Sequence, residues 1–213
     1  MKKSLVCFDL DGTIVDSRMD IANAVNHALV SLGAPALTEP QITSMVGHGL
    51  KKTVELASSA DGDKIDMKMA LQLTIDYYFE HPVVQTTLYD GVEASLKYLN
   101  ENDFVVALFT NKLQPISEKI LDIFKIRRYF SYVIGAESGF EMKPSPTPIE
   151  FMLSDSGCTR EGSFMIGDSS VDIMTGKNAG IKTCLVTYGY GHKGELEPDL
   201  TCASMRELME KIG

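Results

Sequence analysis

Asp9 and Asp11 are the first pair of residues in the chain that could do chemistry together. They stand two positions apart, directly after the apolar run Leu5–Phe8. A run without alternation is typical of a central strand of a parallel sheet, and open α/β sheets bind ligands at the carboxyl ends of such strands. Gly12 lets the chain turn sharply behind the pair. Two neighbouring carboxylates repel each other unless a proton or a cation lies between them, so the pair indicates a site for Mg²⁺, which prefers oxygen ligands.

Thr110, Asn111 and Lys143 are the next candidates. Thr110 and Asn111 follow the apolar run Phe104–Phe109, where a hydroxyl and the following backbone N–H groups could bind a phosphoryl oxygen. Lys143 lies in the segment EMKPSP, whose prolines stiffen the loop and could fix the ammonium in place. A fixed cation would neutralise a carboxylate and an incoming phosphate dianion, which otherwise repel each other.

Asp168 and Asp172 form the last candidate group. The run Ser163–Ile166 predicts a short strand that leads through Gly167 to Asp168, and Asp172 follows at the start of a helix predicted over Ser170–Asn178. An acidic residue at a helix start also interacts favourably with the helix macrodipole. Asp172 could therefore serve the helix, the site, or both.

These segments, in this order, resemble the motifs of the haloacid dehalogenase superfamily, and within it those of the phosphoglycolate phosphatase-like group. DLDGTIV is similar to the DxDGT(L/I)V signature, the Thr-Asn pair to the second motif, KPSP to the third and GDSSVD to the GDSxxD motif. The later segment TYGYG is similar to the phosphoglycolate phosphatase-like group as well. The resemblance spans the chain and implies a Mg²⁺-dependent enzyme of phosphoryl transfer.

The resemblance implies a role for each candidate residue. Asp9 would attack phosphorus, Asp11 would act as general acid and then general base, and Lys143 would neutralise charge. The implied metal ligands are Asp9, Asp11 through its backbone carbonyl, and Asp168, with Asp172 in support; the implied phosphoryl-binding residues are Thr110, Asn111 and Lys143.

The elements that must position these residues alternate between strand and helix from Tyr89 onward. The pattern predicts strands over Phe104–Phe109, Tyr132–Ile134, Ser163–Ile166 and Lys182–Thr187. It predicts helices over Gly91–Asn100, capped by Asp90, and over Pro115–Phe124, Pro146–Ser156 and Ser170–Asn178. A capping box at Ser204–Glu207 predicts the start of a terminal helix. Such alternation predicts an α/β fold with a Rossmann-like, doubly wound parallel sheet.

Residues 16–84 show a different pattern, with four helices in succession. We expect them to start at Asp16 or Ser17, at the capping box Thr38–Gln41, at Leu50 and at about Lys64, and to end near Gly33, Gly47, Ala57 and Glu80. One crossover between parallel strands needs a single helix. We therefore predict a helical cap domain over 16–84 and a core domain made of 1–15 and 85–213, and the resemblance also implies a helical insert after the first motif.

His48 and Gly49 are the candidate residues of the cap for binding the leaving group. They lie in a glycine-flanked loop between two predicted helices, followed by Lys51 and Lys52, and this arrangement resembles phosphoglycolate phosphatase-like caps. A loop histidine and two lysines on a solvated helix face also have an ordinary structural explanation. Whether His48, Lys51 or Lys52 contacts substrate therefore stays open.

Composition narrows the classes of partner. The 213-residue chain has a net charge of -9 and no Lys/Arg-rich run, which argues against nucleic acid. No apolar run approaches a membrane span, and Asp9 interrupts the first one too early for a signal peptide. The four cysteines, Cys7, Cys158, Cys184 and Cys202, lack disulfide or zinc spacing. We expect reduced thiols, a cytoplasmic location, a small phosphorylated substrate, and either a monomer or a homodimer.

The function we expect is Mg²⁺-dependent hydrolysis of a small, phosphoglycolate-like phosphate monoester through an aspartyl-phosphate. Two alternatives stay open: a pyrophosphatase or 5'-nucleotidase with the same core motifs, and a β-phosphoglucomutase-like phosphomutase, which dependence on glucose bisphosphate would reveal. Dehalogenase activity is disfavoured, because that branch lacks a second Asp at the position of Asp11. A non-catalytic role is disfavoured, because every implied catalytic position is filled.

Overall fold

The core of the protein is a six-stranded parallel sheet. The computed structural model describes residues 4–59 and 65–212. The sheet has the order β5-β4-β1-β6-β7-β8, and its neighbouring strands pair in parallel. These strands are β1 (Leu5–Phe8), β4 (Val105–Leu113), β5 (Tyr132–Ala136), β6 (Phe164–Gly167), β7 (Lys182–Val186) and β8 (Leu200–Cys202). The expected α/β class and parallel sheet are confirmed, and the first strand lies at the centre of the sheet.

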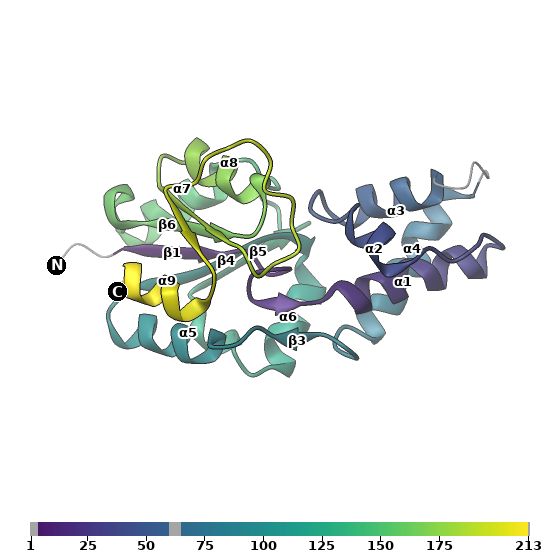
Figure 1. Ribbon diagram of the computed structural model, residues 1–213, viewed down its shortest axis with the longest axis horizontal. Coiled ribbons are helices and arrows are strands. Elements are labelled where there is room, and N and C mark those ends of the chain that lie inside the picture. The colour runs from purple at the N-terminus through teal and green to yellow at the C-terminus, as the bar shows by residue number, and fades with distance from the viewer. Residues whose placement is uncertain (1–3, 60–64, 213) are drawn as a thin grey trace.

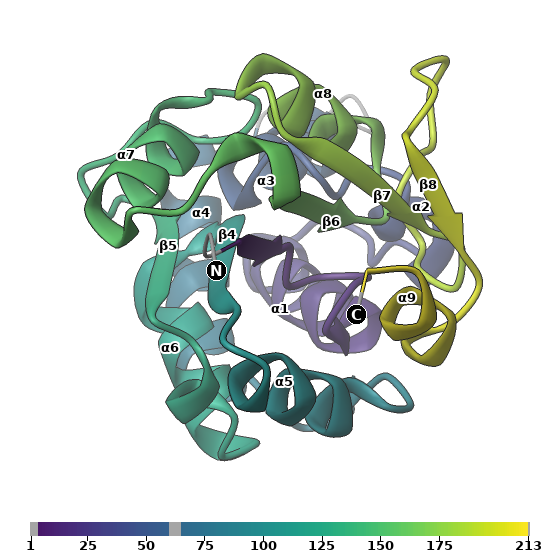
Figure 2. The same ribbon diagram turned by 90° about the vertical axis from the view of Figure 1, so that its left-hand side faces the viewer.

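Helices cover both faces of this sheet (Figure 2). They are α5 (Val92–Glu101), α6 (Gln114–Ile123), α7 (Thr147–Ser156), α8 (Ser170–Asn178) and α9 (Met205–Ile212), with short 3-10 turns at Arg127–Tyr129 and Arg160–Gly162. Alternate residues of β1 enter different clusters: Val6 and Phe8 pack with α5, α6 and α9, and Leu5 and Cys7 pack with α7. This double burial explains why the first strand is apolar throughout.

A helical insertion extends from the carboxyl edge of the sheet, opposite the two chain ends (Figure 1). It consists of α1 (Arg18–Ser31), α2 (Glu39–Thr43), α3 (Leu50–Ser59) and α4 (Met67–Glu80). The capping box of Thr38 with Gln41 is formed, and Asp66 caps α4. The expected break at Ala60–Asp63 and the expected helix start at Lys64 lie outside the described residues. In α4, the Tyr78 side chain is buried, whereas Met69 is exposed.

Two short strands join the insertion to the core. β2 (Val15–Asp16) and β3 (Thr87–Leu88) pair antiparallel. The Asp20 carboxylate, 2 % exposed, accepts hydrogen bonds from the backbone N–H groups of Val84, Gln85 and Thr86, and from the Thr86 hydroxyl. The first turn of α1 is therefore fastened to the segment that returns to the core, close to the predicted domain boundary.

Replacing Asp20 with Ala should lower the free energy of unfolding by about 3 kcal/mol, because three backbone donors and a hydroxyl lose a charged acceptor inside the protein. Urea denaturation followed by circular dichroism measures this change. The control is Asp76→Ala, which removes an exposed carboxylate from α4. Equal stability of the two variants would show that the Asp20 contacts do not hold the connections together.

Several local predictions were wrong in ways that bear on the site. β4 runs on to Leu113, past the expected end at Phe109, and its register against β5 shifts between these two residues. The irregularity falls at the polar residues 110–112, near the carboxyl end of the strand. Asp90 does not cap α5, whose N-cap is Gly91. β2, β3 and β8 were not predicted, because runs of two or three residues carry no readable periodicity.

Two further observations concern the environment of the protein. The four cysteines are unpaired and buried, as expected. None of the described helices combines the length and the hydropathy needed to cross a bilayer.

Candidate active site

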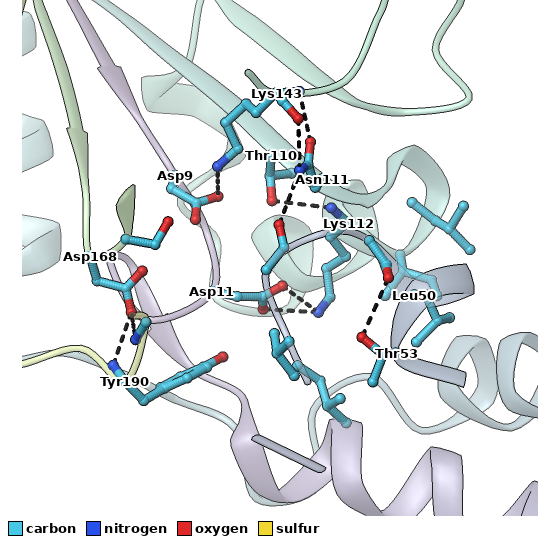
Figure 3. Close-up of a pocket in the computed structure, with 18 of the residues that line it drawn as sticks. Asp9, Asp11, Leu50, Thr53, Thr110, Asn111, Lys112, Lys143, Asp168 and Tyr190 are labelled. Atoms are coloured by element: carbon cyan, nitrogen blue, oxygen red, sulfur yellow. Dashed lines mark hydrogen bonds and ion pairs between the residues drawn. The ribbon is translucent and has the colours of Figure 1, made fainter. Parts of the chain in front are cut away.

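Asp9 and Asp11 lie on the turn that follows β1, at the carboxyl edge of the sheet (Figure 3). The turn is tight, because the Leu10 carbonyl accepts hydrogen bonds from the backbone N–H groups of three residues that follow it. Gly12 has a φ of 81°, and a Cβ there would come within 1.8 Å of an Asp168 carboxylate oxygen. Only glycine satisfies both conditions. The backbone thus brings Asp9 and Asp168 together across two strands.

Lys143 lies between two carboxylates. Its Nζ is 2.8 Å from Asp9 Oδ1 and 2.6 Å from Asp172 Oδ1, and the side chain is only 3 % exposed. Burial disfavours the charged ammonium, but the charges of Asp172 and Asp9 more than offset this, so the pKa of Lys143 is raised. A buried ammonium therefore lies beside the Asp9 carboxylate.

Asn111 fastens the Lys143 loop to β4. Its Oδ1 accepts from the Lys143 backbone N–H at 2.8 Å, and its Nδ2 donates to the carbonyls of Lys143 and Gly47. The amide thereby connects β4, the lysine loop and the insertion. Thr110 is buried beside it, and its hydroxyl accepts from the backbone N–H of Lys112.

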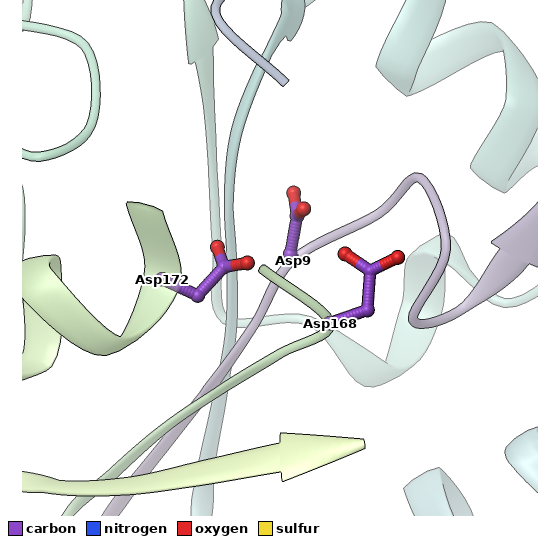
Figure 4. A group of neighbouring side chains, drawn as sticks. All are labelled: Asp9, Asp168 and Asp172. Carbon is purple, nitrogen blue, oxygen red and sulfur yellow. The ribbon is translucent and has the colours of Figure 1, made fainter. Parts of the chain in front are cut away.

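Asp9, Asp168 and Asp172 form a compact acidic cluster (Figure 4), whose ligand atoms lie within 4.8 Å of one another. Burial raises the pKa of Asp168 to about 8, and the charges of Asp172 and Asp9 add to this effect. Burial also raises the pKa of Asp9 to about 6, against the opposing charge of Lys143. Asp172 accepts hydrogen bonds from the backbone N–H and hydroxyl of Ser169 in a capping box, and it also contacts Lys143.

The cluster fits a hard dication. Asp172 is occupied by Lys143 and Ser169, whereas Asp9 Oδ2 and Asp168 Oδ1 have no partner among the hydrogen bonds of the described residues. Asp168 is oriented by the backbone N–H groups of Tyr190 and Gly191, which donate to its Oδ2. Two crowded carboxylates with raised pKa values are those that a cation would stabilise.

Stability should depend on pH through Asp168. Its pKa is raised from 3.8 to about 8 on folding, so the folded, metal-free protein holds a proton that the unfolded chain has released. The free energy of unfolding should therefore fall as pH rises from about 4 to about 8, and Mg²⁺ should restore most of it at high pH. Urea midpoints in EDTA at about pH 5 and about pH 9 measure the fall. Asp168→Asn should flatten it; an equally steep fall in that variant would contradict the assignment.

Asp11 is held by residues that we did not predict. Lys112 Nζ lies 2.9 Å from both of its carboxylate oxygens, and the Ser17 hydroxyl donates to it at 2.5 Å. Ser17 is the N-cap residue of α1, one of the two expected, but its side chain makes no capping hydrogen bond. Its oxygen also lies 3.0 Å from the hydroxyl of Tyr190. The one signal in the sequence that could have indicated these contacts was the position of Lys112, next to Thr110 and Asn111.

The residues of the insertion divide between two neighbouring cavities. The first, about 60 Å³, contains the carboxylates and is bounded on the insertion side by Gly47, Gly49, Leu50, Thr53 and Tyr78. The second, about 340 Å³, is lined by His48, Lys51 and Lys52, and shares Gly49, Leu50, Asn111 and Leu113 with the first. Gly49 therefore lies at the candidate site, whereas His48 and the two lysines lie in the adjoining space.

Comparisons with known proteins agree with this geometry. Residues 6–186 match the model of the haloacid dehalogenase-like hydrolases. The chain is similar to the phosphoglycolate phosphatase of Aquifex aeolicus, with 34% identity over 97% of this chain and 95% of that protein. It is also similar to phosphoglycolate phosphatase 1 of Pseudomonas aeruginosa, with 35% identity over 96% of this chain and 78% of the relative.

A solved structure shows the same fold. The crystal structure of a predicted phosphoglycolate phosphatase from Haemophilus somnus superimposes with a TM-score of 0.92, at 27% identity, and covers 100% of this chain and 99% of that one. Together, the family match, the relatives and the buried carboxylates at the sheet edge lead to one conclusion: this chain belongs to the haloacid dehalogenase-like hydrolases.

Proposed function

We propose that this protein is a Mg²⁺-dependent phosphatase that hydrolyses a small, phosphoglycolate-like phosphate monoester through an aspartyl-phosphate on Asp9. The observation that carries the proposal is the environment of Asp9. Its carboxylate is 8 % exposed, lies 2.8 Å from the Lys143 ammonium, and lines a cavity together with Asp11 and Asp168. A buried carboxylate beside a fixed cation is suited to nucleophilic attack on a dianion, because the cation offsets their repulsion.

The reaction would proceed as two displacements at phosphorus. A carboxylate oxygen of Asp9 forms a bond to phosphorus as the bond to the ester oxygen breaks, and protonated Asp11 gives its proton to the departing oxygen. Asp11 then takes a proton from a water molecule that attacks the aspartyl-phosphate, which releases phosphate and regenerates Asp9. Lys143, the Thr110 hydroxyl and the backbone N–H of Asn111 would hold the transferring phosphoryl group.

Mg²⁺ would be held by Asp9, Asp168 and the backbone carbonyl of Asp11, and would supply positive charge next to the phosphoryl oxygens. Asp172 would support these metal ligands indirectly, because it fixes Lys143 and the start of α8. Asn111 would serve positioning more than binding, since its amide is already bonded to the Lys143 loop and to Gly47.

The size of the cavity favours a small ester. A space of about 60 Å³ beside the carboxylates has room for a few heavy atoms, and a larger leaving group would have to extend into the adjoining cavity of about 340 Å³. The relatives named phosphoglycolate phosphatase support a two-carbon leaving group. The unpaired, buried cysteines are consistent with a cytoplasmic enzyme.

The test is phosphate release from 2-phosphoglycolate, pyrophosphate, nucleoside monophosphates and sugar phosphates, each with Mg²⁺ and with EDTA. We expect Mg²⁺-dependent release with a sharp preference for phosphoglycolate. Turnover of a sugar phosphate that depends on glucose bisphosphate would instead identify a mutase. No Mg²⁺-dependent release from any of these compounds would contradict the proposal.

A further inference from the structure

Lys112 is a buried cation that holds Asp11 but has no assigned contact with substrate in the proposed phosphoryl chemistry. It is 7 % exposed and extends from the irregular end of β4 to the Asp11 carboxylate, 2.9 Å away (Figure 3). Its ammonium also lies 4.4 Å from the ring centre of Tyr78, on α4 of the insertion. Keeping a lysine charged inside a protein is costly unless an opposite charge lies beside it, and here the Asp11 carboxylate offsets part of that cost. The ammonium thus stays charged at the edge of the cavity.

The geometry puts that charge within reach of the leaving group. If Asp11 protonates the ester oxygen, this oxygen lies within hydrogen-bond distance of the Asp11 carboxyl. Lys112 Nζ lies 2.9 Å from the same carboxyl, so the ester oxygen and the ammonium are at most roughly 6 Å apart, the sum of two hydrogen-bond lengths. An anionic group two bonds beyond the ester oxygen can span this separation.

Lys112 is the less neutralised of the two lysines that line the cavity. Among the described residues there, the lysines are Lys112 and Lys143. Lys143 contacts two carboxylates, Asp9 and Asp172, whereas Lys112 contacts one, that of Asp11. Tyr78 adds a second donor, because its buried hydroxyl has no hydrogen-bond partner among the described residues. Burial raises the pKa of Tyr78 to about 12, so this hydroxyl keeps its proton. An unpaired buried hydroxyl is unfavourable unless a ligand accepts from it.

We propose that Lys112, assisted by the Tyr78 hydroxyl, binds a carboxylate on the leaving group, so that the enzyme selects small phosphate esters whose ester carbon carries a carboxylate. This inference rests on the proposed phosphatase function and assigns its leaving-group specificity to a core residue and a residue of the insertion. His48, Lys51 and Lys52 line the adjoining cavity and are not required for this recognition.

The experiment compares 2-phosphoglycolate with carbamoylmethyl phosphate, in which a neutral amide replaces the carboxylate. We expect wild type to prefer the carboxylate by roughly 30-fold or more in kcat/KM, as for a charge pair away from bulk water, and Lys112→Met to lose most of this preference. Lys112→Arg should retain part of it. The matched control is Lys97→Met, a lysine that is 63% exposed on α5, which should keep the wild-type ratio.

Binding to wild type gives a second test that depends on no variant. The non-hydrolysable 3-phosphonopropionate should inhibit with a Ki roughly 30-fold below that of its amide. Equal kcat/KM values or equal Ki values for the carboxylate and amide forms would overturn the Lys112 assignment, as would an unchanged preference in Lys112→Met. These results would leave the phosphatase proposal standing so long as hydrolysis requires Mg²⁺ and Asp9. Absence of hydrolysis of both esters would instead refute the phosphatase proposal.

Discussion

Asp9→Asn should lower phosphate release by at least about 10⁴-fold while the protein stays folded. The amide is nearly isosteric but is a poor nucleophile, and the reaction we propose has no other residue to accept the phosphoryl group. The fold should survive because Lys143 keeps its 2.6 Å contact with Asp172. Steady-state phosphate release with Mg²⁺, together with a thermal melt, measures both effects.

The matched control for this variant is Asp122→Asn, which makes the same change at an exposed position in α6. It should retain wild-type turnover. Activity of Asp9→Asn within tenfold of wild type would refute the nucleophile assignment, whatever the substrate.

Lys143→Met should affect stability and turnover through two separable causes. The Asp172 side chain is fully buried, and loss of its ion pair should lower the free energy of unfolding by about 3 kcal/mol. Turnover should fall by about 10³-fold, because Asp9 and the phosphate lose the cation that offsets their repulsion. Urea denaturation and phosphate release measure the two effects.

The double variant Lys143→Met/Asp172→Asn separates these causes. It removes the unpaired buried charge and should recover most of the stability, but it should recover little turnover, because the cation next to Asp9 is still missing. Lys97→Met, at an exposed lysine, should change neither quantity. If turnover returned together with stability, Lys143 would have a structural role only.

The strand ends were the most predictable part of the structure. β1 is apolar because both of its faces are covered, and this makes the position of Asp9 at its carboxyl end readable from the sequence. The same reasoning places Asp168 after β6. Parallel neighbours in a sheet bring their carboxyl ends together, so the closeness of Asp9 and Asp168 follows from topology alone.

Contacts across the insertion were not predictable in the same way. Lys112 looked like the polar residue that follows any strand, but it lies within β4, at a shift in register, and contacts Asp11. His48 is next to Gly49 in the sequence, yet Gly49 lines both cavities whereas His48 lines only the second. Helical periodicity can indicate that Tyr78 is buried, but it does not indicate which residues of the core contact it. Such pairings depend on how two separate layers meet, which local patterns do not encode.

The stereochemical course at phosphorus tests the aspartyl-phosphate mechanism most directly. A chiral phosphorothioate analogue of phosphoglycolate would be hydrolysed in isotopically labelled water with Mg²⁺, and the configuration of the released thiophosphate would be determined. Two in-line displacements, first by Asp9 and then by water, predict overall retention of configuration. Inversion would show a single direct attack by water and would contradict the covalent role of Asp9.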